Sequence, residues 1–196
     1  ENECGVIAPG MDADLIMLDF AQPHLIPCHN PISNLKLASG VAPIAKMLQA
    51  GCRIALGTDG VASNNNLNLW EEIKLMPMLQ KGTLLDPTVV SPAQTLAAAT
   101  SVGARALGYE NLGLLKPGYL ADLILVDMGA AHFCPCNDLE SDLVYTVQGS
   151  DVTLTMVNGQ VLYDHGAYPT LNAALVLQRA RREAEALFER AQAARK

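Results

Sequence analysis

The order of hydrophobic and polar residues predicts helices and short strands in turn along the chain. Residues 42–51 carry apolar side chains at helical spacing and end at a glycine. Residues 53–58 hold a short apolar run that predicts a buried strand. Residues 67–79 return to helical spacing, although Pro77 is expected to kink or end that helix. The first half therefore has the helix–strand–helix pattern of a βα barrel.

The second half continues with a capped helix, a hairpin and a long terminal helix. A Ser-Pro pair, typical of an N-cap followed by the first helical position, opens a predicted helix over residues 91–108. Residues 151–166 contain two alternating runs around an Asn-Gly pair, which predicts a β-hairpin. From about Asn172 the pattern predicts an amphipathic helix. The strands of this half indicate a β unit separate from the barrel-like pattern.

One segment occurs twice, because residues 5–30 align without gaps on residues 113–138. A Pro-Gly turn, the run Ala-Asp-Leu-Ile and a bounding Asp predict a turn followed by a strand in both copies. We expect residues 5–28 to fold like residues 113–136 and to pack in or beside the same β unit. The shared residues include Gly5/Gly113, Pro9/Pro117, Gly10/Gly118, Asp14/Asp122, Asp19/Asp127, His24/His132 and Cys28/Cys136.

Composition narrows the possible partners and the compartment. Half of the residues are hydrophobic, enough for a sizeable core, and the net charge of −7 argues against a nucleic-acid partner. No apolar run approaches the length of a membrane span. The five cysteines are an odd number without the spacing of a disulfide framework, and we expect no signal peptide. We therefore expect a cytoplasmic protein with reduced thiols and with neither a nucleic-acid nor a membrane partner.

Asp59 follows the predicted strand directly, within Gly-Thr-Asp-Gly. βα-barrel enzymes hold catalytic residues at the carboxyl ends of their strands, although Thr-Asp-Gly also forms ordinary turns. The surrounding sequence, HNPISNLKLASGVAPIAKMLQAGCRIALGTDGVASNNNLNLWEEIKL (29–75), closely resembles the last two βα units of the 5′-methylthioadenosine/S-adenosylhomocysteine deaminases. This is a branch of the amidohydrolase superfamily. The resemblance continues through SPAQTLAAATSVGARALG, LKPGYLADLILVD and MVNGQVLYDHGAYPTL.

The resemblance implies an α/β fold: an incomplete (β/α)8 metal-dependent hydrolase barrel of the TIM type, a composite β-sandwich segment and a C-terminal helix. We expect a duplicated post-barrel β segment over residues 1–28 and the last barrel units over 29–112. The β-sandwich segment is expected over 113–170 and the helix over 171–196.

The resemblance also implies hydrolytic deamination of an adenosine-type nucleoside, with zinc or another divalent metal as cofactor. Asp59 matches the aspartate that ligates the metal, handles the proton of the attacking water and touches the substrate ring. This suits a carboxylate, because a metal lowers the pKa of bound water and a nearby base takes its proton. Residues expected to shape the pocket are His29, Asn30, Ser33, Asn34, Ser63 and Asn64.

The histidine ligands of such a metal site are missing. The family has a His-x-His pair and two further single histidines, whereas none of the four histidines of this chain forms such a pair. We therefore expect a portion of an enzyme that holds no zinc and is inactive by itself. Asp59 is then expected to lack a compensating partner, so that Asp59→Asn changes stability little or raises it.

Two other interpretations stay open. One is a non-catalytic remnant that self-associates, because part of a barrel exposes strand edges and apolar faces. The other is a different substrate for the same chemistry, as in chlorohydrolases and in triazine, guanine or cytosine aminohydrolases.

Overall fold

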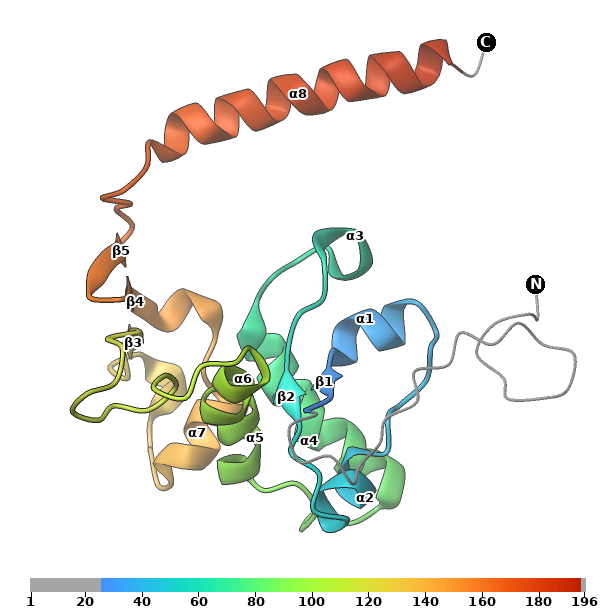
Figure 1. Cartoon of the computed structure of the whole chain (residues 1–196), viewed down its shortest axis with the longest axis vertical. Helices are drawn as coiled ribbons and strands as arrows, with labels where there is room; N and C mark the ends of the chain where they lie inside the picture. Colours follow the sequence, from blue (N-terminus) through green and yellow to red (C-terminus); the bar gives the residue numbers. More distant parts are fainter. Residues whose placement is uncertain (1–25, 195–196) are drawn as a thin grey trace, which may run out of the picture. The chain divides into compact units, whose positions relative to one another are not determined.

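A computed structural model describes residues 26–194, and these form two units (Figure 1). Of the described residues, the first unit contains those up to Tyr119 together with Met128–Asp151, and the second contains Leu120–Asp127 and those from Val152. The fold is α/β, and no helix in the range 26–194 is long and apolar enough to cross a membrane.

The first unit is built on two short parallel strands. Strand β1 pairs with β2 so that Cys28 lies opposite Ala55 and His29 opposite Leu56. Helices α1 and α2 connect the two strands, as Figure 1 shows. The elements are β1 (Cys28–His29), α1 (Pro31–Lys36), α2 (Ile44–Gln49), β2 (Ala55–Leu56), α3 (Val61–Asn64), α4 (Leu69–Leu84), α5 (Pro92–Ala99), α6 (Ser101–Ala106), η1 (Ala131–Phe133), α7 (Leu139–Tyr145) and η2 (Gly149–Asp151).

The predicted helix over residues 42–51 and the predicted strand over 53–58 are confirmed by α2 and β2. The expectation that Pro77 could end the next helix is wrong, because α4 continues through Pro77 to Leu84. Proline removes one backbone hydrogen bond from the helix interior. Burial of the α4 face that includes Ile73 and Met76 offsets that loss.

The predicted cap of residues 91–108 is confirmed, but the helix is divided. The Ser91 hydroxyl accepts a hydrogen bond from the Gln94 N–H at 3.3 Å, and Gln94 Oε1 accepts one from the Ser91 N–H at 2.9 Å. At Thr100 the backbone leaves helical geometry, with φ −125° and ψ −95°. The Thr100 hydroxyl donates to the Leu96 carbonyl at 2.6 Å, a local bond that competes with the helical ladder. Helices α5 and α6 therefore replace one continuous helix.

The core of the first unit lies where β2, α2, α4, α5 and α7 meet. Helix α4 buries residues at positions spaced three to four apart, which gives it one continuous inner face. The buried core side chains are Ile44, Ala45, Ile54, Leu56, Ile73, Met76, Val90, Ala98 and Val144. This core fixes β2 and therefore the residues that follow it.

The second unit is a three-stranded antiparallel sheet followed by a helix. Strand β4 (Val152–Val157) lies between β3 (Leu123–Val126) and β5 (Gln160–Asp164), and α8 spans Ala173–Ala193. The predicted hairpin is confirmed: Asn158 and Gly159 both have positive φ, 49° and 76°, as a type I′ turn requires. The predicted start of the last helix is also confirmed, because Asn172 caps it by accepting from the Leu175 N–H.

The second copy of the repeated segment forms the predicted turn and strand. The Tyr119 N–H closes the Pro-Gly turn on the Lys116 carbonyl at 3.1 Å, and β3 follows. Residues 5–25 of the first copy lie outside the described residues, so the expected match between the copies stays a prediction. The boundaries at residues 28, 112 and 170 stay predictions as well.

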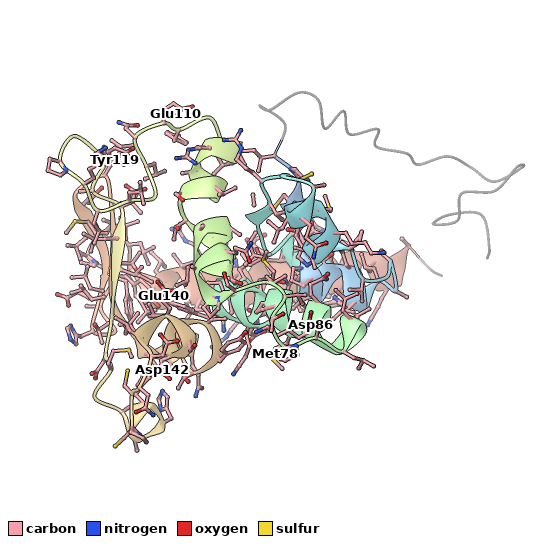
Figure 2. All side chains as sticks on the ribbon, turned by 90° about the horizontal axis from the view of Figure 1, so that it is seen from below. Met78, Asp86, Glu110, Tyr119, Glu140 and Asp142 are labelled. Carbon is pink, nitrogen blue, oxygen red and sulfur yellow. The ribbon has the colours of Figure 1, made fainter. Side chains whose placement is uncertain are left out.

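Replacing Met76 by alanine tests the core. Met76 is 0% exposed in the inner face of α4, so Met76→Ala should lower the free energy of unfolding by about 2–5 kcal/mol. Met78 on the same helix is 49% exposed (Figure 2), and Met78→Ala should stay within about 0.5 kcal/mol of the parent chain. Urea unfolding followed by circular dichroism measures both. Equal losses in the two variants would contradict this packing.

Candidate active site around Asp59

Asp59 lies just beyond the carboxyl end of β2, beside the residues that follow β1. Because the two strands are parallel, their carboxyl ends share one edge of the sheet. Asp59 has φ 61°, the left-handed region, which aspartate tolerates better than most residues. A residue other than glycine keeps this backbone conformation only where contacts with the surrounding structure offset its energetic cost.

Both carboxylate oxygens of Asp59 have a donor within the chain. Oδ2 accepts from the Ser33 hydroxyl at 2.6 Å, and Oδ1 accepts from the Gly60 N–H at 2.7 Å. The Ser33 hydroxyl, followed by the Gly60 amide, holds the pKa of Asp59 below its ordinary value of 3.8. Asp59 is therefore ionised at neutral pH. The expectation that Asp59 lacks a compensating partner is wrong, so the neutral or raised stability expected for Asp59→Asn loses its basis.

Glu72 is a second carboxylate near Asp59 that the sequence did not reveal. Its side chain is fully buried in α4. Oε2 accepts from the Ile32 N–H at 3.0 Å, and Oε1 accepts from Asn64 Nδ2 at 2.6 Å. Burial raises the pKa of Glu72 above its ordinary value of 4.5, while the bonds from Ile32 and Asn64 oppose that rise. Its position in the helical pattern could have predicted this burial, because Glu72 shares the inner face of α4 with Ile73 and Met76.

The loop after β2 is tied to the strand by polar side chains. Asn64 Nδ2 also donates to the Thr58 carbonyl at 2.6 Å, and the Ser63 hydroxyl donates to the Gly60 carbonyl at 3.0 Å. Ser33, Ser63 and Asn64, three of the residues expected to shape the pocket, thus surround Asp59 and its two neighbours.

The remaining predicted pocket residues follow β1. The Asn34 N–H donates to the Asn30 carbonyl at 3.0 Å. A Cβ on Gly57 would lie 2.8 Å from Asn30 Oδ1, so glycine permits the side chain of Asn30 to approach β2. His29 is 4% exposed, and neither ring nitrogen has a hydrogen-bond partner. Burial lowers the pKa of His29 from 6.5 to about 4, so its ring is neutral at pH 7.

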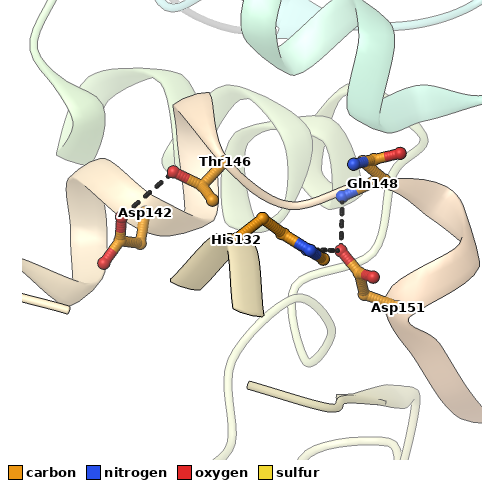
Figure 3. Close-up of polar contacts among 5 residues, drawn as sticks. All are labelled: His132, Asp142, Thr146, Gln148 and Asp151. Carbon is orange, nitrogen blue, oxygen red and sulfur yellow. Dashed lines mark hydrogen bonds and ion pairs between the residues drawn. The ribbon is translucent and has the colours of Figure 1, made fainter. Parts of the chain in front are cut away.

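His132 has a structural role away from this site. Its Nε2 lies 3.0 Å from Asp151 Oδ2, which also accepts from the Gln148 N–H at 2.8 Å (Figure 3). His165 lies 2.6 Å from Asp164 in the second unit, and His24 is outside the described residues.

The described residues do not fit a complete zinc site. A catalytic zinc takes about three protein ligands. Between residues 26 and 194 no group of three or more His, Cys, Asp or Glu side chains is arranged to hold a metal ion. Asp59 is the one metal ligand that the sequence predicted near the carboxyl ends of β1 and β2.

Comparison with known proteins agrees with this geometry. A model of the amidohydrolase family matches residues 24–162, most of the chain. The chain belongs to the amidohydrolase family. The resemblance drawn from the sequence is thereby confirmed, as is the expected fold at the level of this family.

Relatives within the family are named as deaminases. The chain is 50% identical over 165 residues to a 5′-deoxyadenosine deaminase of Methanosarcina barkeri. It is 48% identical over 162 residues to a 5-methylthioadenosine/S-adenosylhomocysteine deaminase of Dictyoglomus thermophilum. These alignments cover 84% and 83% of this chain but 38% of each relative, so the chain spans well under half of their length.

A solved structure of a deaminase also resembles this chain. An adenosine deaminase from Xanthomonas campestris with bound zinc has a TM-score of 0.80 and 34% identity to this chain. The match covers 84% of this chain and 38% of that protein. A divalent metal is therefore known in a close structural neighbour.

The titration of His29 predicts a pH-dependent stability. Its pKa is about 4 in the folded chain and 6.5 when unfolded, so between these values the unfolded chain binds more protons. Stability should fall as the pH drops from about 6.5 to 4, by up to about 3 kcal/mol from this residue.

His29→Leu should remove this part of the pH dependence. Urea unfolding at several pH values between 7 and 4 measures the slopes. A His29→Leu variant with the slope of the parent chain would contradict the buried, neutral ring.

Proposed function

We propose that this chain contributes Asp59 to the hydrolytic deamination of adenosine-type nucleosides, such as 5′-methylthioadenosine and S-adenosylhomocysteine. In this proposal β1 and β2 are the last two strands of a (β/α)8 barrel, and β3–β5 belong to the β-sandwich segment. The observation that carries the proposal is the ionised Asp59 at the carboxyl end of β2, held by Ser33 and Gly60. The names of the relatives favour an adenosine-type substrate over a triazine, guanine or cytosine.

The chemistry needs a group that moves a proton. Water adds to the ring carbon that carries the amine, the carbon–nitrogen bond breaks, and ammonia leaves. The water must lose a proton and the leaving amine must gain one. A carboxylate has about four acceptor positions, and the donors Ser33, Gly60 and Ser63 leave at least one of them for water or substrate. Asp59 can therefore take the proton and pass it on.

The other residues at this edge of the sheet form part of the pocket in this proposal. His29, Asn30, Ser33, Asn34, Ser63 and Asn64 shape the wall that a small-molecule nucleoside contacts. The His29 ring is 4% exposed and neutral, so it supports the wall by packing and adds no charge to the pocket. The histidines of the metal site would come from outside these 196 residues, and the reduced cysteines favour the cytoplasm.

Self-association is a second candidate property. Among the described residues, the parallel sheet of the first unit consists of β1 and β2 only. Each of these strands has one edge without a strand partner in the described part of the chain, and such edges pair with other chains. Sedimentation of the purified chain over a range of concentrations would show this association.

The chain by itself should not release ammonia from S-adenosylhomocysteine when zinc is added. The reason is the ligand set, because one carboxylate cannot replace about three protein ligands. A coupled ammonia assay with and without a chelator measures this. Zinc-dependent release that the chelator abolishes would show that the chain holds a full site.

A chimera tests the proposed role of Asp59. The section of the Methanosarcina barkeri deaminase that aligns with this chain is replaced by this chain, and ammonia release from 5′-deoxyadenosine is measured. The chimera should be active, and Asp59→Asn should lower kcat by about 10²–10⁴-fold, because the proton carrier is lost.

Asp86→Asn is the matched control for this chimera. Hydrogen bonds from Thr88 also lower the pKa of Asp86, but it lies in the loop after α4. Its replacement should leave kcat within about twofold. Equal activity of the parent and Asp59→Asn chimeras would remove Asp59 from the reaction.

A further inference from the structure

We propose that Glu72 is the positioning residue of Asp59: its buried carboxylate fixes both backbone segments that hold the Asp59 side chain in place. The role in catalysis rests on the function proposed above, whereas the positioning itself is a property of this chain. Glu72 does not contact the reacting atoms in this proposal, and it acts through Ile32 and Asn64.

The first connection runs through α1. Glu72 Oε2 accepts the Ile32 N–H at 3.0 Å. Ile32 lies in the first turn of α1, where backbone N–H groups have no partner inside the helix. The next residue, Ser33, is 2% exposed and donates its hydroxyl to Asp59 at 2.6 Å. Glu72 therefore determines where the Ser33 donor lies.

The second connection runs through Asn64. Asn64 Nδ2 donates to Glu72 Oε1 and to the Thr58 carbonyl, both at 2.6 Å. Thr58 directly precedes Asp59, whose φ of 61° requires support from its surroundings. Asn64 is 6% exposed, so water does not compete for these bonds. The Glu72–Asn64 contact therefore holds the backbone at the point where it turns into the left-handed region.

Only a carboxylate meets both connections. The two donors, the Ile32 N–H and Asn64 Nδ2, face the two oxygens of Glu72. A glutamine has a single acceptor oxygen, and its amide nitrogen would face one of these donors. An apolar residue would suit the surrounding core but would leave both donors without a partner. Burying the Glu72 charge in α4 costs stability, but the two hydrogen bonds that this charge accepts fix the backbone around Asp59.

Nuclear magnetic resonance of the full chain tests the proposal through the Gly60 amide, which donates to Asp59 Oδ1 at 2.7 Å. In Glu72→Gln the Gly60 proton should shift upfield, towards the value of a free amide. Its hydrogen exchange should become about tenfold faster, because the Asp59 side chain loses its fixed place.

Two comparison variants separate positioning from stability. Met76→Ala destabilises the same helix from the core but leaves the polar network intact, so the Gly60 proton shift should not change. Glu71→Gln replaces the exposed neighbour of Glu72 on α4 and should also leave the Gly60 shift unchanged. Both spectra are recorded at a temperature where every variant is folded by circular dichroism.

Asn64→Ala provides an independent test if Glu72→Gln does not fold. It breaks the connection to Thr58 and leaves the Ile32–Glu72 bond, so the Gly60 shift should move while the Ile32 amide stays in place. A folded Glu72→Gln chain with the parent Gly60 shift and exchange rate would overturn the proposal. So would a chain that unfolds in both variants, since the network would then serve folding alone.

These outcomes do not depend on deamination. A moved Gly60 signal in Glu72→Gln, together with an Asp59→Asn chimera that stays fully active, would retain Glu72 as a positioning residue and reject the function proposed for Asp59. An unmoved Gly60 signal with an inactive Asp59→Asn chimera would give the reverse result.

Discussion

The buried carboxylate of Glu72 is the contact on which the geometry of the candidate site depends. It joins α4, the helix with the largest buried face in the first unit, to the start of α1 and to the loop after β2. Those two segments carry Ser33 and Asp59. The hydrophobic core places β2, but the core cannot specify where a side chain beyond the strand end points, because dispersion contacts have little directionality. The hydrogen bonds of Glu72 supply that direction.

The electrostatics of the site follow from this arrangement. Asp59 and Glu72 are both carboxylates, yet their environments move their pKa values in opposite directions. Donors from Ser33 and Gly60 lower the pKa of Asp59, and burial raises the pKa of Glu72. The first carboxylate therefore stays charged where water can reach it, and the second is enclosed by protein. Such a separation suits one reacting and one supporting carboxylate.

The sequence predicted the features that short-range rules determine. The Asn158-Gly159 hairpin, the Ser91 cap and the Asn172 helix start depend on a few neighbouring residues, and all three are confirmed. The helix over residues 67–79 does not end at Pro77, because packing stabilises its continuation, and the helix predicted over residues 91–108 is divided at Thr100, where a local hydroxyl bond forms. Gly60, one partner of Asp59, is its neighbour in the chain, whereas Ser33 lies 26 residues away, so no local pattern could show the Ser33 bond. The burial of Glu72 was not predicted, because a charged residue beside Glu71 at the start of a helix is usually exposed to solvent.

In the proposed function, this chain supplies the carboxylate of a metal-dependent site and not the site as a whole. The most direct measurement is the zinc content of the purified chain after incubation with zinc and dialysis, read by mass spectrometry beside the chimera with the Methanosarcina barkeri deaminase. The account predicts close to no zinc per isolated chain and bound zinc in the chimera that falls with Asp59→Asn. An isolated chain that retains a stoichiometric zinc, independent of Asp59, would contradict it.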